Sequence, residues 1–456
     1  MSEKIRLITP RTPSGVMELL PQQQIAFQRF LTTIQTAYER FGFVPVETPV
    51  FETTEVLLTK DGGETEKQVY FVQSTGALQQ GHAPDMALRF DLTVPLARYV
   101  AQHEHQLNFP FRRYQMQKVY RGERPQKGRE REFYQCDIDV IGKDELSINY
   151  DAELPAIIAS IFTSLGIGKF QIQINNRKLL KGLLESFGLL DNEKQTLALR
   201  ELDKLDKIGL KEVITRLQAP EIALSEDVAT RLLDLMGTNR SNAKTLQLLN
   251  NISEKPELLA RGLEELTLVY NGLRALGVAE ENVRLNLTTV RGLDYYTGTV
   301  YETLMLEHPD WGSICSGGRY ENLAGHYTKS KLPGVGISIG ATRLFELLLE
   351  SGLIKPEEAS LTDVIILQLD PELMADYLKL ASDLRGRGLN VEVYMDPHKL
   401  GKQLKYADRA GAPYAVLMGS DEKAKGTVTL KHLKVAQQEE VKLAEVAGHI
   451  QRMMSA

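Results

Sequence analysis

At 456 residues, with 25% charged and 43% apolar residues, the chain has the composition of an ordinary soluble protein and the length for two or three domains, each with its own core. The net charge of −6 argues against indiscriminate binding to polyanions, and the two cysteines, Cys136 and Cys315, are too few for a disulfide framework or a cysteine-type zinc site, so we expect reduced thiols. No apolar run is long enough to cross a bilayer, and the segment MSEKIRLITP lacks the apolar centre of a signal peptide, so we expect a cytoplasmic protein with no membrane partner.

The N-terminal part of the sequence predicts one helix followed by strands. Apolar residues spaced three and four apart over 22–41 predict an amphipathic helix. The next segment, 42–50, is extended, and because Pro45 and Pro49 cannot donate to a ladder, we expect an edge or interface strand there. From 85 to 142, strand patterns dominate.

Four short segments predict strands that carry polar or small residues on one side. Every second side chain of a strand shares a face, so each of these sets occupies one face. If the strands share a sheet, one face of that sheet is a polar site and the other is a core. The sets are Arg89, Asp91 and Thr93 in 88–93; Arg121 and Glu123 in 119–123; Gln135, Asp137 and Asp139 in 133–141; and Gly334, Gly336, Ser338 and Gly340 in 334–340.

The segment 111–131 is strongly basic, with eight Lys or Arg residues against Glu123 and Glu130. Such a patch in an acidic protein favours a phosphate site. On charge alone, a solvated basic face is the alternative.

The glycine-rich segment 334–340 is not a dinucleotide fingerprint, because its spacing is wrong and it does not lie in a βαβ unit. Its period of two predicts a flat face on which a planar base can lie, with Arg343 at the start of the next helix as a fixed cation. The chain contains no P-loop motif, so ATP would bind on a sheet. Arg121 and Glu123 offer a cation for phosphate and an acceptor for an adenine amino group, although such a pair alone is more often a surface ion pair.

The second half of the chain predicts a helical module and a further domain. Residues 177–280 are rich in Leu, Lys and Glu at helical spacing, which predicts a helical insertion between two strand-rich parts. Strand patterns resume near Val283, a helix is expected at 341–352, and 351–358 predicts a linker. Beyond it, strands alternate with helix-length segments and a helix ends the chain, as in a small α/β domain. These strands are expected at 364–369, 391–394, 414–418 and 427–433.

Two segments hold polar and aromatic residues at high density. The segment 291–302 packs one cation, two carboxylates and three phenols into twelve residues, which is too polar for a core strand and too aromatic for a loop. The segment 315–320 supplies a tight glycine turn, for which a plain hairpin is the alternative.

Together these segments resemble the histidyl-tRNA synthetase family of class II aminoacyl-tRNA synthetases, over essentially the whole chain. Arg-Gly-Leu-Asp-Tyr-Tyr at 291–296 and Gly-Gly-Arg-Tyr at 317–320 are similar to the two histidine-specific motifs of the family. Pro49, 120–126 and 336–344 are similar to the proline of motif 1, to motif 2 with its loop and to motif 3. Each match alone is weak, but their joint occurrence in this order is specific.

The resemblance implies an α+β fold: the antiparallel catalytic sheet of class II synthetases, with six strands and flanking helices, a helical insertion and a C-terminal α/β anticodon-binding domain. It also implies a homodimer. The expected domains are 1–176, the first part of the catalytic core with motifs 1 and 2; 177–280, the helical insertion; 281–352, the second part of the core; and 361–456, the anticodon-binding domain.

The resemblance also implies roles for individual residues. Arg121 and Arg291 would be catalytic and flank the α-phosphate and the carboxylate. The expected histidine-binding residues are Asp91, Leu92, Thr93, Gln135, Asp139, Tyr295 and Tyr296, with Asp91, Thr93 and Gln135 on the α-ammonium group and Asp139 with Tyr295 or Tyr296 on the imidazole. The expected ATP-binding residues are Arg121, Glu123, Arg129, Gly340 and Arg343, and Arg124 and Gln126 would contact the acceptor end of the tRNA.

The implied activity is ATP-dependent attachment of L-histidine to tRNA(His) through histidyl-adenylate, with release of AMP and pyrophosphate. ATP as substrate and Mg²⁺ are the implied cofactors, and no side chain is assigned to a metal. In the C-terminal domain, cations recur at helical spacing beside two tyrosines, which fits nucleic-acid binding; a solvated face is the alternative. These residues are Lys399, Lys402, Lys405 and Arg409 with Tyr394 and Tyr406.

Two other functions fit parts of the pattern. A synthetase-like regulatory subunit of ATP phosphoribosyltransferase keeps the fold without aminoacylation activity, but it typically lacks the intact catalytic arginine segment and the anticodon domain, and this chain has both. An RNA-binding or signalling module with an inactive sheet would tolerate loss of Arg121, Arg291 or Asp91, and none of them is lost.

Overall fold

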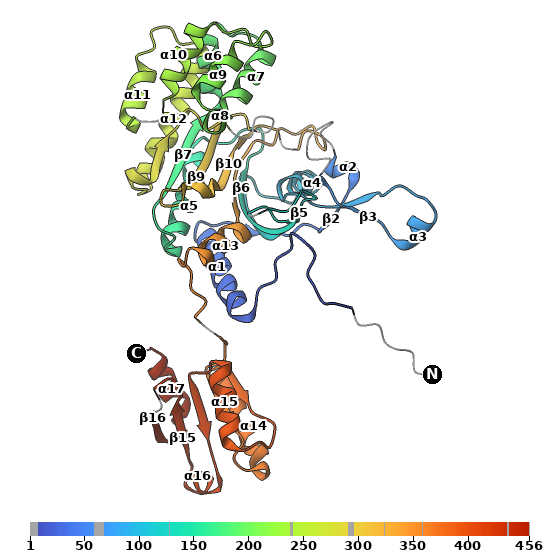
Figure 1. The fold of residues 1–456 in the computed structure, drawn as a ribbon, viewed down its shortest axis with the longest axis vertical. Helices are drawn as coiled ribbons and strands as arrows, with labels where there is room; N and C mark the ends of the chain where they lie inside the picture. The colour runs from blue at the N-terminus through green and yellow to red at the C-terminus, as the bar shows by residue number, and fades with distance from the viewer. Residues whose placement is uncertain are drawn as a thin grey trace. The chain divides into compact units, whose positions relative to one another are not determined.

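The computed structural model describes residues 8–58, 68–126, 128–237, 240–290, 296–322, 324–357, 359–435 and 437–455. Contacts divide the chain into two compact units, one formed by Met1–Met17 with Phe30–Leu353 and the other by Glu18–Arg29 with Ile354–Ala456. The larger unit contains the large sheet and the smaller unit a second sheet (Figure 1). None of the helices in the described ranges is both long enough and apolar enough to span a bilayer.

The large sheet has eight strands in the order β1-β5-β6-β11-β10-β9-β7-β8. Its six central strands pair antiparallel, and a short parallel strand is added at each edge. This arrangement confirms the predicted antiparallel catalytic sheet. The strands are β1 Val44–Pro45, β5 Phe111–Tyr120, β6 Glu132–Ile141, β7 Phe170–Asn176, β8 Val283–Leu285, β9 Thr299–Met305, β10 Ser313–Tyr320 and β11 Gly334–Gly340.

Helices cover the apolar face of this sheet, as the alternation in β6 predicts. Cys136 and Ile138 on β6 are fully buried, and the hydroxyl of Tyr38 donates to the Cys136 carbonyl at 3.1 Å. Phe30 and Phe345 pack with their ring centres 5.6 Å apart. The covering helices are α1 Pro21–Arg40, α5 Asn149–Leu165 and α13 Ala341–Glu350.

A three-stranded sheet in the order β2-β4-β3 extends from the larger unit, with α3 at its tip (Figure 1). Its strands are too short to have been recognised in the sequence. The elements are β2 Phe51–Thr53, α2 Thr54–Leu57, β3 Phe71–Val72, α3 Thr75–Gln79 and β4 Met86–Leu88, and α4 Thr93–His103 follows.

The strand predicted at 88–93 is wrong. β4 ends at Leu88, and α4 begins at Thr93. Asp91 ends the intervening turn by accepting a hydrogen bond from the Val94 backbone N–H at 3.0 Å, so the polar alternation comes from a turn and a helix start. Arg89 does not share a ligand face, because it is 1% exposed and donates to the carbonyls of Thr48 and Lys118.

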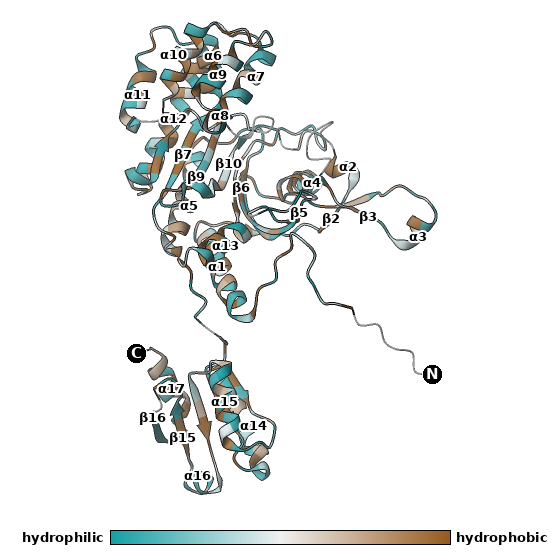
Figure 2. Ribbon diagram, in the orientation of Figure 1, coloured by the Kyte–Doolittle hydropathy of each residue, from teal (hydrophilic) through white to brown (hydrophobic). Residues whose placement is uncertain are grey.

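Helices α6 to α12 form a bundle that contacts β7 and α5 (Figure 1), and they carry both hydrophobic and hydrophilic stretches (Figure 2). Two glycines let α6 and α12 approach closely: a Cβ at Gly182 would lie 2.2 Å from the Leu259 nitrogen, and one at Gly262 would lie 2.1 Å from the Leu179 nitrogen. The elements are α6 Arg177–Ser186, α7 Asn192–Leu202, α8 Leu205–Ile208, α9 Leu210–Leu217, α10 Glu226–Met236, α11 Asn242–Asn250, α12 Glu257–Ala275 and the short η2 Glu280–Asn282.

The smaller unit is built on a mixed sheet in the order β13-β12-β14-β15-β16. β12 is buried on both faces, as its unbroken apolar run predicts. The edge strand β16 escaped prediction because its sequence is polar and Val441 is its one buried residue. The elements are β12 Val364–Leu367, η4 Pro371–Leu373, α14 Met374–Gly386, β13 Val391–Val393, α15 Leu400–Ala410, β14 Tyr414–Leu417, α16 Ser420–Lys425, β15 Thr427–His432, β16 Gln437–Lys442 and α17 Val446–Ser455.

Candidate active site

Three neighbouring strands of the large sheet place polar residues side by side. β5, β6 and β11 are consecutive in the sheet, and their register aligns three rows of residues across them. Alternate residues of β6 share a face, so the predicted polar face of 133–141 is the one on which these rows meet. The rows are Arg113, Asp139 and Gly336; Gln115, Asp137 and Ser338; and Gln117, Gln135 and Gly340.

A cavity of about 490 Å³ adjoins one end of these rows. All the residues that the resemblance assigns to ATP line it, and so does Gln135. They come from the loop between β5 and β6 and from the junction of β11 with α13. The ATP candidates that line the cavity are Arg121, Glu123, Arg129, Gly340 and Arg343.

Arg121 is held in place by the chain itself. β5 ends at Tyr120, so the strand predicted over 119–123 stops before Arg121. The Arg121 Nε donates to the Phe90 carbonyl at 3.1 Å, and its guanidinium carbon lies 5.1 Å from the centre of the Phe133 ring. These contacts orient the guanidinium independently of a ligand, which is what preorganised charge stabilisation requires.

The loop that follows Arg121 carries the other motif 2 candidates. Arg129 lies 3.8 Å from the Glu123 carboxylate, with a side chain 65% exposed, so this pair is weak and can open to a ligand. Gln126 and Arg129 exchange backbone hydrogen bonds of 2.8 and 3.3 Å that close a tight turn. Arg124 and Gln126 are exposed on this turn and are not among the residues that line the cavity.

Arg343 lies in the first turn of α13 and donates to the carbonyls of Trp311 and Ser313. Gly128 packs over it: its φ is +74°, and a Cβ there would lie 2.9 Å from the Arg343 Nε. A glycine in the loop of motif 2 is therefore needed to seat the arginine of motif 3.

The flat glycine face predicted for 334–340 is wrong for two of its members. A Cβ on Gly336 would lie 2.1 Å from the Asp139 carboxylate, and one on Gly334 would lie 2.4 Å from the Tyr320 ring, so those side chains fill the space. Nothing lies within 4 Å of the Cβ position of Gly340. The uncovered surface is therefore at the Gly340 end, which is the end that lines the large cavity.

A second, smaller cavity of about 30 Å³ lies on the same polar face. Three of the residues expected to bind histidine, Thr93, Asp139 and Tyr296, line it. Ser338 lines both cavities and so marks their junction. Asp137, Tyr320, Gly336 and Ile337 complete the lining.

Asp139 is fixed by two partners. Its Oδ2 lies 2.6 Å from the guanidinium of Arg113, which is fully buried, and its Oδ1 accepts a hydrogen bond from the Tyr320 hydroxyl at 3.0 Å. Burial raises the pKa of the Asp139 carboxyl, and the Arg113 charge opposes this rise. Burial and the Asp139 charge raise the pKa of the Tyr296 phenol, which therefore stays protonated and able to donate.

The remaining histidine candidates have different surroundings. Burial raises the pKa of Asp91, while the Val94 N–H and the Arg121 charge lower it. Gln135 donates from Nε2 to the Ser338 hydroxyl at 3.1 Å. The side chain of Leu92 is fully buried, so it has no surface to offer a ligand.

Two candidates, Arg291 and Tyr295, lie outside the described residues. Arg113 was not identified from the sequence as a residue of the site. The pairings of Tyr320 with Asp139 and of Ser338 with Gln135 were not predicted either. A signal existed, because Arg113, Gln115 and Gln117 alternate along β5 as the polar residues of β6 do.

The basic segment 111–131 is only partly a phosphate site. Three of its cations are paired within the protein: Arg112 with Glu153 at 2.9 Å, Arg113 with Asp139, and Lys118 with Glu132 at 2.6 Å. Arg121 and Arg129 line the large cavity.

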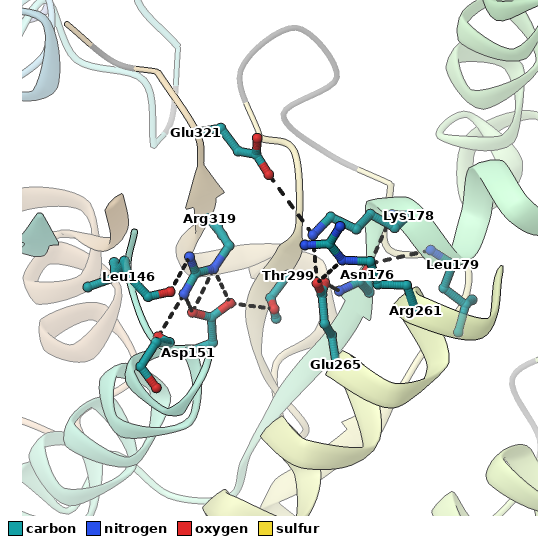
Figure 3. A network of polar contacts seen from close by, with 11 residues as sticks. Leu146, Asp151, Asn176, Lys178, Leu179, Arg261, Glu265, Thr299, Arg319 and Glu321 are labelled. Carbon is teal, nitrogen blue, oxygen red and sulfur yellow. Dashed lines mark hydrogen bonds and ion pairs between the residues drawn. The ribbon is translucent and has the colours of Figure 1, made fainter. Parts of the chain in front are cut away.

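The second histidine-specific motif holds the sheet to α5. Arg319 on β10 donates from Nε and Nη2 to the carboxylate of Asp151, with N–O distances of 2.7 to 3.0 Å, and from Nη1 to the carbonyl of Leu146 (Figure 3). It also donates to the carbonyl of Ser147 at 2.9 Å. The hydroxyl of the next residue, Tyr320, donates to Asp139, and both residues line the small cavity. The motif at 317–320 therefore helps to position the wall of that cavity.

The cations that recur at helical spacing in the C-terminal domain lie on α15 and, for Lys399, just before it. Tyr406 is 42% exposed, and its hydroxyl donates to Glu392 at 2.6 Å. Tyr394 is 9% exposed and packs 5.2 Å from Tyr406, so Tyr406 is the tyrosine that has a free surface for stacking.

Comparison with known proteins identifies the family. The sequence profile described as "Histidyl-tRNA synthetase" matches residues 15–344, and that of the "Anticodon binding domain" matches residues 363–453. The chain belongs to the histidyl-tRNA synthetase family. It is 55% identical to the histidine–tRNA ligase of Xanthomonas campestris pv. campestris, over 98% of this chain and 96% of that protein.

Solved structures of family members agree. The histidyl-tRNA synthetase of Nostoc sp. PCC 7120 is 40% identical, with a TM-score of 0.88 over 98% of this chain and 100% of that one. A protein of Bacillus halodurans described as an ATP phosphoribosyltransferase regulatory subunit/histidyl-tRNA synthetase is 21% identical, with a TM-score of 0.71 over 88% of this chain and 97% of that one. This second likeness shows the shared fold alone.

Proposed function

We infer that the protein is a histidine–tRNA ligase, which attaches L-histidine to tRNA(His) through histidyl-adenylate and releases AMP and pyrophosphate. The observation that carries this inference is the pair of cavities that meet at Ser338, one lined by arginines and the other by carboxylates and tyrosines. The identity to curated histidine–tRNA ligases over nearly the whole chain supports it.

The first step is attack of the histidine carboxylate on the α-phosphorus of ATP, which expels pyrophosphate. The carboxylate is already charged, so no nucleophilic side chain is needed, and catalysis is positioning and charge stabilisation. Arg121 would bind the α-phosphate together with Arg291, and Arg129 and Arg343 would bind the outer phosphates. Glu123 would accept from the adenine amino group, and the base would lie over Gly340.

In the second step a hydroxyl of the terminal ribose of the tRNA attacks the acyl carbon and AMP leaves. Arg124 and Gln126 would contact this acceptor end, and their exposure on the motif 2 turn supports that role. The C-terminal unit would bind the anticodon, where Tyr406 and the cations of α15 offer stacking and charge.

Bound histidine would be held at both ends. Asp91, Thr93 and Gln135 would bind the α-ammonium group, and Asp139 with Tyr296 would face the imidazole ring. The buried carboxylates and the protonated Tyr296 phenol fit a ligand that presents both N–H donors and a ring-nitrogen acceptor.

Mg²⁺ fits the large cavity as a partner of ATP. Glu130 lines that cavity, and Mg²⁺ is usually bound by one or two carboxylates together with phosphate oxygens. No cluster of three or more potential metal ligands occurs in the described part of the chain. The ion would neutralise charge on the phosphates as pyrophosphate leaves.

Purified protein is expected to catalyse exchange between ATP and pyrophosphate that depends on histidine and needs no tRNA. The regulatory-subunit alternative predicts no such exchange, and so does an inactive RNA-binding module. Replacing Arg291 by alanine is expected to abolish the exchange and leave the circular dichroism spectrum unchanged. An exchange rate near that of the wild type in this variant would show that the catalytic role assigned to Arg291 is wrong.

We also propose a homodimer joined through the small sheet of β2, β3 and β4. Phe51, Phe71 and Met86 on these strands and Leu78 on α3 are exposed apolar side chains, and exposed apolar surface that gathers in one place is typical of interaction sites. A second copy of this chain would cover them. We also propose a cytoplasmic location, a reducing compartment in which the thiols of Cys136 and Cys315 would stay unpaired.

Sedimentation equilibrium is expected to give twice the chain mass of 51.2 kDa. Phe71→Glu should shift the protein toward monomer, because it would bury a charge in the interface. Leu190→Glu is the matched control: Leu190 is 74% exposed on the helical insertion, and its replacement should leave the mass unchanged. A wild-type monomer at all concentrations would contradict the dimer.

A further inference from the structure

Two carboxylates, those of Asp137 and Asp139, line the small cavity, and among the described residues only Asp139 has partners for both of its oxygens. Both oxygens of Asp139 have partners, Tyr320 at 3.0 Å and Arg113 at 2.6 Å. Asp137, two residues earlier on the same face of β6, is 3% exposed, and its Oδ1 has no hydrogen-bond partner in the described part of the chain. A buried carboxyl oxygen without a donor is costly, so this atom is a place for a ligand N–H.

The two cavities set the direction in which histidine lies. Its carboxylate has to reach the α-phosphate of ATP, so it faces the larger cavity, which Arg121 and Gln135 line. The side chain then extends past Ser338 into the smaller cavity. There it meets the rings of Tyr296 and Tyr320 and the Asp137 carboxyl, which together suit a flat ring that carries an N–H.

We propose that Asp137 is a further specificity-determining residue, whose Oδ1 accepts a hydrogen bond from an imidazole N–H of bound histidine. This inference deepens the function proposed above and rests on it. An amino acid with an apolar side chain of similar shape would leave the buried oxygen unpaired, and such sites discriminate strongly.

Charged and titratable groups from several elements interact with Asp137. Its pKa is raised to about 7: burial raises it, Arg113 and the Ser338 hydroxyl lower it, and Asp139 and Asp91 raise it. The imidazole of free histidine titrates near pH 6.5, in the same range. The other groups that interact with the Asp137 charge are Tyr38 on α1, Cys136 on β6, Cys315 on β10 and Tyr296.

This overlap predicts proton release when histidine binds at acid pH. A neutral imidazole N–H that donates to the ionised Asp137 carboxylate leaves no titratable proton on either group. At about pH 6 the two free groups together carry more than one titratable proton, so binding releases protons; at about pH 8 both are mostly deprotonated, so few protons are exchanged. Histidine affinity should therefore rise from acid pH and level off above neutral pH.

The replacement Asp137→Asn tests the proposal, because the carboxamide keeps the shape but does not ionise. In histidine-dependent exchange at about pH 8, where the Asp137 carboxyl is ionised and the ring is neutral, the KM for histidine should rise about 10- to 100-fold. The wild-type KM should rise toward acid through the titration of both groups, and the variant should keep only the rise that belongs to the ring. Its KM for ATP should equal that of the wild type.

Calorimetric titration of the wild-type protein with histidine gives a second measurement that needs no variant. In buffers of different ionisation enthalpy, release of more than one proton at about pH 6 and of few protons at about pH 8 is expected. A release at about pH 6 no greater than the proton carried by the free histidine ring, or a variant with the wild-type KM and pH profile, overturns the role of Asp137 alone. Absence of histidine-dependent exchange by the wild type overturns the function itself.

Discussion

Replacing Arg121 by alanine is expected to lower the kcat of histidine-dependent ATP–pyrophosphate exchange by about 10² to 10³. The Phe90 carbonyl and the Phe133 ring hold the Arg121 guanidinium in one orientation at the wall of the large cavity. A charge fixed in this way stabilises the transition state without reorganisation, and alanine removes it completely. Initial rates at saturating histidine and ATP measure the effect.

Two further variants separate this effect from a general loss of positive charge. Arg231→Ala removes an exposed arginine on α10 that is paired with Asp227 at 3.5 Å, and it should leave the exchange rate unchanged. Arg121→Lys keeps the charge but loses the planar fork, so its rate should lie between alanine and wild type. A kcat for Arg121→Ala equal to that of Arg231→Ala would show that the phosphate is bound elsewhere.

The polar face of β6 was predictable because one simple rule determined it. Strands place alternate residues on opposite faces, and in 134–140 the apolar set and the polar set are cleanly separated. The same rule predicted β11, and unbroken apolar runs predicted the buried strands of the C-terminal sheet. These elements needed no knowledge of their neighbours.

Prediction failed where a short pattern had two explanations. The alternation of 88–93 fits a strand, but it also fits a turn in which Asp91 caps α4, and six residues cannot distinguish them. Arg113 was counted as part of a basic surface because its partner Asp139 is on another strand and only the register shows the pair. Pairings of this kind are properties of the sheet and not of a sequence window.

The prediction of a flat glycine face at 334–340 was wrong because it left out the neighbouring strands. Their lack of side chains was interpreted as room for a ligand, but at Gly336 that room is taken by Asp139. The glycine therefore makes room for the Asp139 carboxylate, and Gly340 alone keeps the uncovered surface that was expected of the whole segment. A glycine face predicts close approach, and the neighbouring strand decides what approaches.

Replacing Asp151 by alanine is expected to destabilise the larger unit by about 3 to 5 kcal/mol. Asp151 is fully buried, and its carboxylate accepts from the guanidinium of Arg319 and from the Thr299 hydroxyl at 2.6 Å (Figure 3). The alanine variant leaves the Arg319 charge buried without its counterion, and that penalty exceeds the loss of the hydrogen bonds themselves.

The single tryptophan, Trp311, is buried in the larger unit, so its fluorescence in urea reports unfolding of that unit alone. The double variant Asp151→Ala with Arg319→Met should lose less stability than the sum of the two single variants, because neither charge remains unpaired. Arg231→Ala, which breaks an exposed helical pair, should cost about 0.3 to 0.5 kcal/mol. Additive losses of stability in the double variant would show that Asp151 and Arg319 stabilise the larger unit separately and not through their ion pair.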